Sequence, residues 1–340
     1  MKNPKVTVVT IMFGDRWKFL SQVVTAVMKD KYVTNLIIVD NGSNNKIEIE
    51  EGVKMYGERV TVLRQEYNLG SAGGFALALA EAQKVECDYV LILDDDSVPD
   101  EGFVQEFLNL LDLFPNRKVV LSGNRIDLPG NKDFFYLPVL SNKSAQNTFF
   151  EVFSFRKLFL FLRKLTRKAK FIDYTRPFVP IVPNHAFVYG GAFIPISAVR
   201  EAPLPDASLV LYGDDVEYSW RIKRLGYDSY VCARPIIRDL EVSFGGDHIL
   251  GLFDPKAQLF RVYYRLRNMV RISRRNTTQA PAVLFLNIVV WTLGLFIVGL
   301  CKYGFSVAYF KRVKLVTVAV LAGYYSGYLT PEEAKLPNSR

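Results

Sequence analysis

Three consecutive aspartates, Asp94-Asp95-Asp96, directly follow the apolar run YVLIL at residues 89–93. Adjacent carboxylates repel one another and are costly to bury without a partner. In an extended segment Asp94 and Asp96 point to the same side. Both can therefore bind one hard cation, Mg²⁺ or Mn²⁺, whose remaining ligands are diphosphate oxygens. The alternative is an acidic turn with solvated side chains, but a position at the end of an apolar strand favours metal binding.

A second acidic cluster lies in the segment YGDDVEYSWR at residues 212–221. Aspartate is common at the start of a helix, and such capping explains one of the two aspartates. The other can act as a general base that takes a proton from an acceptor hydroxyl. We predict this role for Asp215, and we expect Asp214 and Glu217 to hold the acceptor sugar.

A run of small residues, Asn68 to Gly74, follows the third predicted strand. It is not a dinucleotide fingerprint, because G-S-A-G-G lacks the G-x-G-x-x-G spacing. Small side chains allow a ligand to approach the start of the next helix. Asp40 ends the second predicted strand, where a carboxylate can bind a ribose or a base. For both features an ordinary turn is the alternative.

Histidine and cysteine contribute little to the candidate chemistry. Of the two histidines, His185 lies in a proline-rich loop and His248 is a candidate third metal ligand. A Ser-His-Asp triad or a zinc site is poorly supported with so little histidine. The three cysteines, Cys87, Cys232 and Cys301, are too widely spaced for a disulfide scaffold or a CxxC metal site.

The first hundred residues predict the elements that position these side chains. Short β-branched runs, apolar on both faces, are typical of buried strands in a mostly parallel sheet. They alternate with helical patterns, which predicts a doubly wound α/β sheet. The expected strands are 6–12, 36–39, 60–63 and 89–93, and two expected helices are 17–28 and 74–84.

Ligands of such sheets bind beyond the carboxyl ends of the strands. Phe13 follows the first predicted strand and Asp40 ends the second. Arg64 and Asn68 follow the third, and Asp94 follows the fourth. We therefore expect a nucleotide-type ligand to lie at this edge of the sheet.

The formal net charge of +9 is concentrated in two segments. Residues 151–170 carry +6 and residues 256–275 carry +7, so the rest of the chain carries −4. Residues 152–170 also fit a basic amphipathic helix. A nucleic-acid-binding protein and a protein that lies on an anionic membrane would both have such a distribution.

The C-terminal hundred residues contain two apolar segments, 282–300 and 315–329. The first has 19 uncharged residues, which is the lower limit for a membrane span, and the second is short for one. We expect these segments and residues 152–170 to dock at the membrane interface. A true span is one alternative, and helices that only cover the catalytic domain or a dimer partner are another.

Seven segments in order resemble the family 2 glycosyltransferases of the glycosyltransferase A fold, over about residues 5–270. The similarity is closest to the galactofuranosyl- and rhamnosyltransferase branch. The segments are VTVVTIMFGDR, IIVDNGS, NLGSAGG, YVLILDDDSVPD, YGGAFIP, YGDDVEYSWRIKRLGY and YYRLRN. The resemblance implies a doubly wound, mostly parallel α/β catalytic domain at residues 1–250, including the helix at 152–170. A helical, membrane-associating region follows at residues 251–340.

The resemblance also implies roles for individual residues. The base would be Asp215, and the metal ligands would be Asp94, Asp96 and His248. Acceptor binding would involve Asp214, Glu217, Gly190 and Gly191. Donor binding would involve Phe13, Asp40, Arg64, Asn68, Gly70, Gly73 and Asp95.

The implied reaction is an inverting transfer of galactofuranose or rhamnose from a UDP- or dTDP-linked donor. The acceptor would be a lipid-linked cell-surface glycan, and Mg²⁺ or Mn²⁺ the cofactor. The enzyme would work at the cytoplasmic face of the cell membrane without a nucleic-acid partner, and a homo-oligomer is compatible with this interpretation.

Two other classes of protein are alternatives to this enzyme. A non-catalytic membrane-bound scaffold is expected to lose Asp94, Asp96 or Asp215, and all three are present. A nucleic-acid-binding protein would use the aromatic and arginine residues of YYRLRNMVRISRR, but it leaves the aspartates unexplained.

Overall fold

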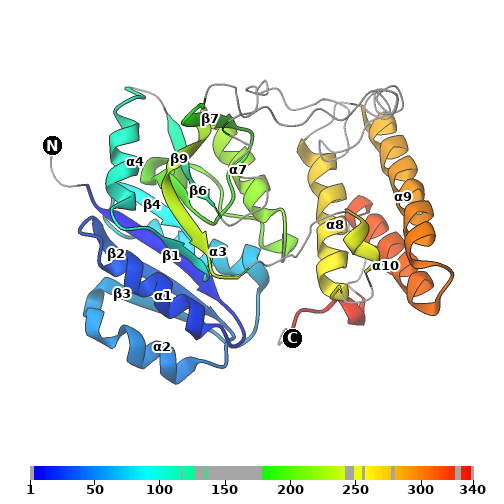
Figure 1. The fold of residues 1–340 in the computed structure, drawn as a ribbon, viewed down its shortest axis with the longest axis horizontal. Helices are drawn as coiled ribbons and strands as arrows, with labels where there is room; N and C mark the ends of the chain where they lie inside the picture. Colours follow the sequence, from blue (N-terminus) through cyan, green and yellow to red (C-terminus); the bar gives the residue numbers. More distant parts are fainter. Residues whose placement is uncertain are drawn as a thin grey trace.

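The computed structural model describes residues 4–115, 118–126, 135, 178–241, 249–254, 257–276, 280–325 and 331–337. A mixed, mostly parallel α/β sheet lies beside a group of C-terminal helices (Figure 1). The predicted α/β fold with a C-terminal helical region is therefore confirmed, whereas membrane association of that region stays a prediction. The predicted amphipathic helix at 152–170 and the candidate metal ligand His248 lie outside the described residues.

One half of the sheet consists of four parallel strands in the order β3-β2-β1-β4. Helices connect consecutive strands, as parallel pairing requires. The strands are β1 (Val6–Met12), β2 (Val33–Asn41), β3 (Val60–Gln65) and β4 (Tyr89–Ile92), and the helices are α1 (Trp17–Met28), α2 (Lys46–Val53) and α3 (Gly70–Ala82).

The other half of the sheet is mixed. β8 pairs with β4 and β6 in antiparallel orientation, whereas β6 and β9 are parallel. β5 and β7 are antiparallel to β9. The elements are β5 (Ser97–Pro99), α4 (Phe103–Leu111), β6 (Val119–Arg125), β7 (Ile181–Asn184), β8 (Ala192–Pro195), α6 (Ile196–Glu201), α7 (Asp214–Arg224) and β9 (Asp228–Asp239).

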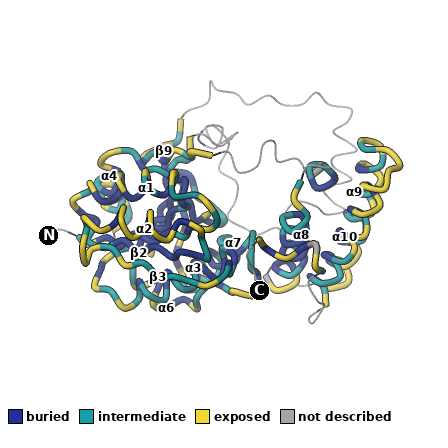
Figure 2. The backbone as a smooth tube through the Cα atoms, turned by 90° about the horizontal axis from the view of Figure 1, so that it is seen from below, coloured by how far each residue is buried: buried dark blue, intermediate teal, exposed yellow. Residues whose placement is uncertain are grey.

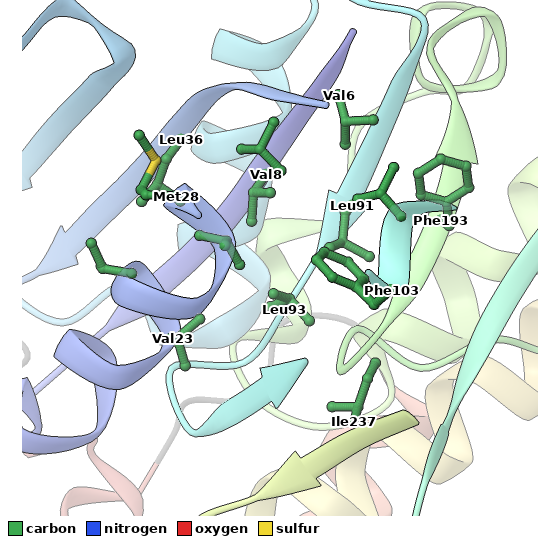
Figure 3. Close-up of a cluster of buried hydrophobic side chains, with 14 of the residues drawn as sticks. Val6, Val8, Val23, Met28, Leu36, Leu91, Leu93, Phe103, Phe193 and Ile237 are labelled. Atoms are coloured by element: carbon green, nitrogen blue, oxygen red, sulfur yellow. The ribbon is translucent and has the colours of Figure 1, made fainter. Parts of the chain in front are cut away.

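The central strands are buried on both faces, which explains their continuous apolar sequences. Along β1, Val6 and Val8 belong to one core and Val9 to the other, because successive side chains alternate. Figure 3 shows the first core, where Leu91 of β4 lies beside Val8 of β1. Helices therefore pack against both faces of the sheet and fix the positions of the strand ends.

Helix α3 begins at Gly70, four residues before the predicted start at residue 74. The expected loop of small residues is therefore the first turn of the helix. Gly70 has a left-handed φ of +75°, and a Cβ at this position would lie 2.1 Å from the carbonyl oxygen of Val210. Glycine is required here because the chain of another segment passes against it.

The C-terminal helices are α8 (Leu259–Asn276), α9 (Pro281–Tyr303) and α10 (Val307–Tyr324), and they share a separate core. The second apolar segment overlaps α10, which begins before it and also contains the basic residues Lys311, Arg312 and Lys314. Among the described helices, α9 alone is long and apolar enough to cross a membrane.

Two side chains of α8 anchor this group of helices to the sheet domain. Arg267 donates to the carbonyl oxygens of Ser208 and Leu209 at 2.8 and 2.7 Å. The Asn268 amide donates to those of Leu209, Leu211 and Tyr212 at 2.7–2.8 Å. Both side chains are buried. They hold the turn that leads into α7.

Helices α8 and α10 pack closely at Gly323, where an added Cβ would lie 2.3 Å from the carbonyl oxygen of Arg267. We predict that Gly323→Ala lowers the free energy of unfolding by about 1–3 kcal/mol, because the two helices must separate. Thermal denaturation measures this loss. Gly294→Ala in α9 is the matched control, since no atom lies within 4 Å of its Cβ position. An equal effect of both substitutions would contradict the close packing.

Candidate active site

A cavity of about 830 Å³ lies between the carboxyl edge of the sheet and the C-terminal helices. Both predicted acidic clusters line it. The predicted residues in its wall are Phe13, Asn68, Gly70, Asp94, Asp95, Asp96, Asp214 and Asp215. The C-terminal region contributes, among others, Arg261, Arg265, Lys302, Tyr303, Leu336 and Pro337.

Several predicted site residues do not line this cavity. They are Asp40, Arg64, Gly73, Glu217, Gly190 and Gly191. Asp40 pairs with Arg64 at 3.0 Å and accepts a hydrogen bond from the Ser43 amide. Glu217 is buried and pairs with Arg221 on the next turn of α7. These contacts give both carboxylates a structural partner within the protein.

Arg16, which precedes α1, binds the second and third aspartates of the triad. Its guanidinium donates to both oxygens of Asp95 at 2.7 and 2.9 Å and to Asp96 at 3.0 Å. It also pairs with Glu241. Asp95 and Asp96 lie in the turn between β4 and β5, so the triad is not the extended segment assumed above.

Arg125, at the end of β6, pairs with the first aspartate of the triad. Its guanidinium lies 3.4 Å from Asp94 Oδ2 and binds Asp239 of β9 through two nitrogens, the shorter contact being 2.7 Å. A Cβ on Gly190 would lie 2.5 Å from Arg125 Nη1 and 2.9 Å from Asp94 Oδ2. Gly190 therefore leaves the space in which Arg125 meets Asp94.

The carboxylates of this region share guanidinium partners. Asp94, Asp95, Asp96, Asp239 and Glu241 are paired with two guanidinium groups, those of the arginines at positions 16 and 125. Burial raises the pKa of each aspartate of the triad to about 6, and neighbouring carboxylates add to the effect. The excess negative charge and the oxygen ligands suit a divalent cation.

The described part of the chain does not by itself form a complete metal site. Within the described ranges, no group of three or more His, Cys, Asp or Glu side chains is arranged to hold a metal ion. Asp94 and Asp96 can therefore supply only part of a coordination sphere, and the remaining ligands would come from a substrate or from outside these ranges.

The second acidic cluster lies at the start of α7. The Ser71 hydroxyl donates to both oxygens of the buried Asp214 at 3.0 Å. Asp215 accepts from the Val216 amide at 2.7 Å and is partly exposed to the cavity. Burial raises the pKa of both carboxyls, and for Asp214 the neighbouring Asp215 adds to the shift. The Asp215 carboxylate is thus more accessible from the cavity than that of Asp214, which is held in place by the Ser71 hydroxyl.

The loop before α3 is fixed by Asn41, at the end of β2. The Asn41 amide donates to Asn68 Oδ1 at 3.1 Å and to the Gly70 carbonyl at 3.0 Å, and its oxygen accepts from the Leu69 amide. The Asn68 side chain also donates to the carbonyl of Pro337 at 3.3 Å. The C-terminal segment therefore reaches the same wall of the cavity.

Sequence reasoning missed several residues of the wall, among them Arg16, Asn41, Arg125 and Tyr189. Arg16 and Asn41 lie a few residues after the first and second predicted strands, so their positions in FGDR and VDN were usable signals. Arg125 carries no local signal, because pairing of distant strands brings it to the triad. The buried Tyr189 hydroxyl has no hydrogen-bond partner within the described part of the chain. An unpartnered buried hydroxyl in a cavity wall is suited to a ligand.

Comparison with known proteins identifies a matching family and a similar enzyme. Residues 7–172 match the profile of glycosyl transferase family 2. The chain is similar to the galactofuranosyltransferase GlfT1 of Mycolicibacterium smegmatis, with 26% identity over 234 residues. The match covers 68% of this chain and 70% of that protein.

Two solved structures have a similar fold. GalNAc-T7 with UDP, GalNAc and Mn²⁺ has a TM-score of 0.55 and 17% identity, and the match covers 80% of this chain and 48% of that chain. Thus the present chain spans about half the length of GalNAc-T7. The mannosyltransferase PcManGT of Pyrobaculum calidifontis with GDP-Man and Mn²⁺ has a TM-score of 0.51 and 14% identity. This match covers 96% of this chain and 76% of that chain.

The raised pKa values of the triad predict how stability depends on pH. The folded carboxyls titrate near 6, whereas the ordinary value is 3.8. Between these values the unfolded chain releases protons that the folded chain retains. The triad's contribution to the free energy of unfolding of the metal-free protein should therefore decrease as pH rises from about 4 to about 6.

The melting temperature measured across this pH range tests the prediction. Asp94→Asn removes one titrating carboxyl and should reduce the pH-dependent loss. Asp228→Asn changes an exposed aspartate at the start of β9 and is the matched control. A pH profile unaltered by Asp94→Asn would contradict the assigned pKa shift.

Proposed function

Because the chain belongs to glycosyltransferase family 2, whose members transfer a sugar from a nucleotide-sugar donor, we propose that the cavity is the site of this transfer. The main observation in support of this proposal is that two acidic clusters, distant in the sequence, line one cavity. The triad at residues 94–96 lies on the side of the donor, and Asp215 lies on the side of the acceptor. The donor would lie against the wall formed by Phe13, Asn68 and Gly70.

Asp215 is proposed to be the general base. Its side chain lines the cavity, and burial raises its pKa, so its carboxylate is a stronger base than that of a free aspartate. The acceptor oxygen loses its proton to Asp215 and attacks the anomeric carbon from the face opposite the nucleotide. The bond to the diphosphate breaks, and the configuration at that carbon inverts. Asp214, held by Ser71, is placed to orient the acceptor sugar.

Asp94 and Asp96 are proposed to hold Mg²⁺ or Mn²⁺, with His248 as a further ligand. The excess of carboxylates supports this proposal, as do the solved structures of similar fold that contain Mn²⁺. Such a cation, when bound, stabilises the negative charge of the leaving diphosphate. Arg16 and Arg125 keep the triad in place by pairing with its carboxylates.

The donor sugar is proposed to be galactofuranose or rhamnose, carried by UDP or dTDP. The similarity to GlfT1, a galactofuranosyltransferase, supports the first of these sugars. The acceptor is proposed to be a lipid-linked cell-surface glycan at the cytoplasmic face of the membrane. Support comes from the apolar and basic C-terminal helices, whose residues Lys302 and Tyr303 form part of the cavity wall.

The role of Asp215 predicts a defined kinetic defect. Asp215→Asn should lower kcat by about 10²–10⁴-fold, because the acceptor loses its base while the donor contacts remain. In the unsubstituted enzyme, kcat should fall as pH is lowered through the raised pKa of this carboxyl. Initial rates of transfer and the KM for the donor measure both effects. Asp228→Asn should retain full activity, and full activity of Asp215→Asn would refute the role.

A donor screen tests the substrate and the cation together. We expect transfer from UDP-galactofuranose or dTDP-rhamnose in the presence of Mg²⁺ or Mn²⁺, and its loss after chelation. Asp94→Asn should weaken Mn²⁺ binding measured by calorimetry in the presence of UDP, because one carboxylate ligand is removed. Transfer that is insensitive to chelation would contradict the proposed cofactor, whereas inactivity with both donors would contradict only the proposed sugars.

A further inference from the structure

One face of α9 is apolar and exposed along the length of the helix. Leu286, Leu293 and Ile297 are 49%, 54% and 62% exposed. Their spacing of seven and four residues places them on the same face. Figure 2 shows exposed backbone positions along the outer part of α9. A contiguous apolar face of this kind marks an interaction surface.

The opposite face of α9 is already occupied by the protein. Leu284, Ile288, Trp291 and Leu295 are buried in the C-terminal core. A Cβ on Gly299 would lie 2.9 Å from the ring of Phe253, so the helix packs closely there. A helix with one packed face and one exposed apolar face is suited to lie in the plane of a membrane interface, although α9 is long enough to cross a membrane.

The exposed face continues into the turn between α9 and α10. Phe305 is 80% exposed, Val307 88% and Phe310 56%. Lys302 and Tyr303, which immediately precede this turn, line the candidate active-site cavity. The most exposed apolar side chains of this region therefore lie next to the wall of the cavity. We call Leu286, Leu293, Ile297, Phe305, Val307 and Phe310 the docking face.

The charge around the docking face identifies the kind of partner that it fits. Residues 257–330 contain ten Lys and Arg and no Asp or Glu. Lys302, Lys311 and Lys314 are exposed beside the turn. An anionic lipid surface attracts such a region. Two copies of the chain joined by this face would bring like charges together, which disfavours a homodimer here.

We propose that the docking face inserts into the interface of a membrane that contains anionic lipids, with α9 parallel to the membrane plane. The apolar side chains enter the boundary between headgroups and acyl chains, and the lysines contact lipid phosphates. This orientation brings the cavity wall at Lys302 and Tyr303 to the membrane surface. The inference concerns where the protein lies, and it does not depend on the identity of the transferred sugar.

Co-sedimentation of the full chain with vesicles tests the proposal. The protein should bind vesicles of mixed phosphatidylglycerol and phosphatidylcholine, and bind phosphatidylcholine alone more weakly. The double variant Ile297→Gln, Phe305→Gln should reduce the partition coefficient by about tenfold or more, because buried methylene groups dominate such insertion. Ile47→Gln is the matched control, since Ile47 is 65% exposed on helix α2 of the sheet domain. It should leave binding unchanged.

Cys301 provides an independent readout within the same helix. It lies four residues after Ile297 and is exposed, whereas Cys87 and Cys232 are buried. An environment-sensitive fluorophore on Cys301 should shift its emission to the blue on the anionic vesicles. No vesicle binding, no spectral shift, or equal binding by the double variant would overturn the proposal. Loss of a dimer in the double variant, seen by sedimentation velocity with vesicle binding unchanged, would instead assign the face to a second copy.

Discussion

The arrangement of the candidate site depends on the anchoring of α8 to the turn at residues 208–212. Arg267 and Asn268 satisfy four carbonyl groups of this turn, in which Val210 and Tyr212 adopt left-handed φ angles. Such angles are costly for residues with a Cβ and persist where surrounding contacts impose them. The turn leads directly into α7, so these hydrogen bonds set the position of Asp215 relative to the sheet. They also join the C-terminal helices to the helix that carries Asp215.

A second constraint is the electrostatic balance around the triad. Arg16 comes from the segment after β1 and Arg125 from the end of β6, yet both lie against carboxylates that follow β4. Removing either guanidinium would leave buried carboxylates without their partner, which is destabilising. Burial raises the pKa values of these carboxyls, and the neighbouring carboxylates add to the shift. A chain with a net charge of +9 thus contains an acidic cavity beside basic helices.

Much of the fold could be predicted from the sequence, because the relevant signals are local. The apolar runs at 6–12 and 89–93 and the helix at 17–28 have nearly the predicted bounds. The start of α3 could not be predicted, since the need for glycine at residue 70 comes from contact with Val210. The mixed half of the sheet was also beyond local patterns, because its strands pair across large separations in the chain.

For the candidate site, the sequence by itself determined which residue types could perform the chemistry and that strand ends would gather them. Asp94, Asp96 and Asp215 were found in this way, and the structure places them around one cavity. Tertiary structure alone decided which neighbours these carboxylates have. It paired the triad with Arg16 and Arg125, removed Asp40 and Glu217 from the cavity wall and closed the cavity with α8 and α9. The reason is physical: residue type and spacing are local properties, whereas charge pairing, burial and shifted pKa values depend on segments that meet only in the folded chain.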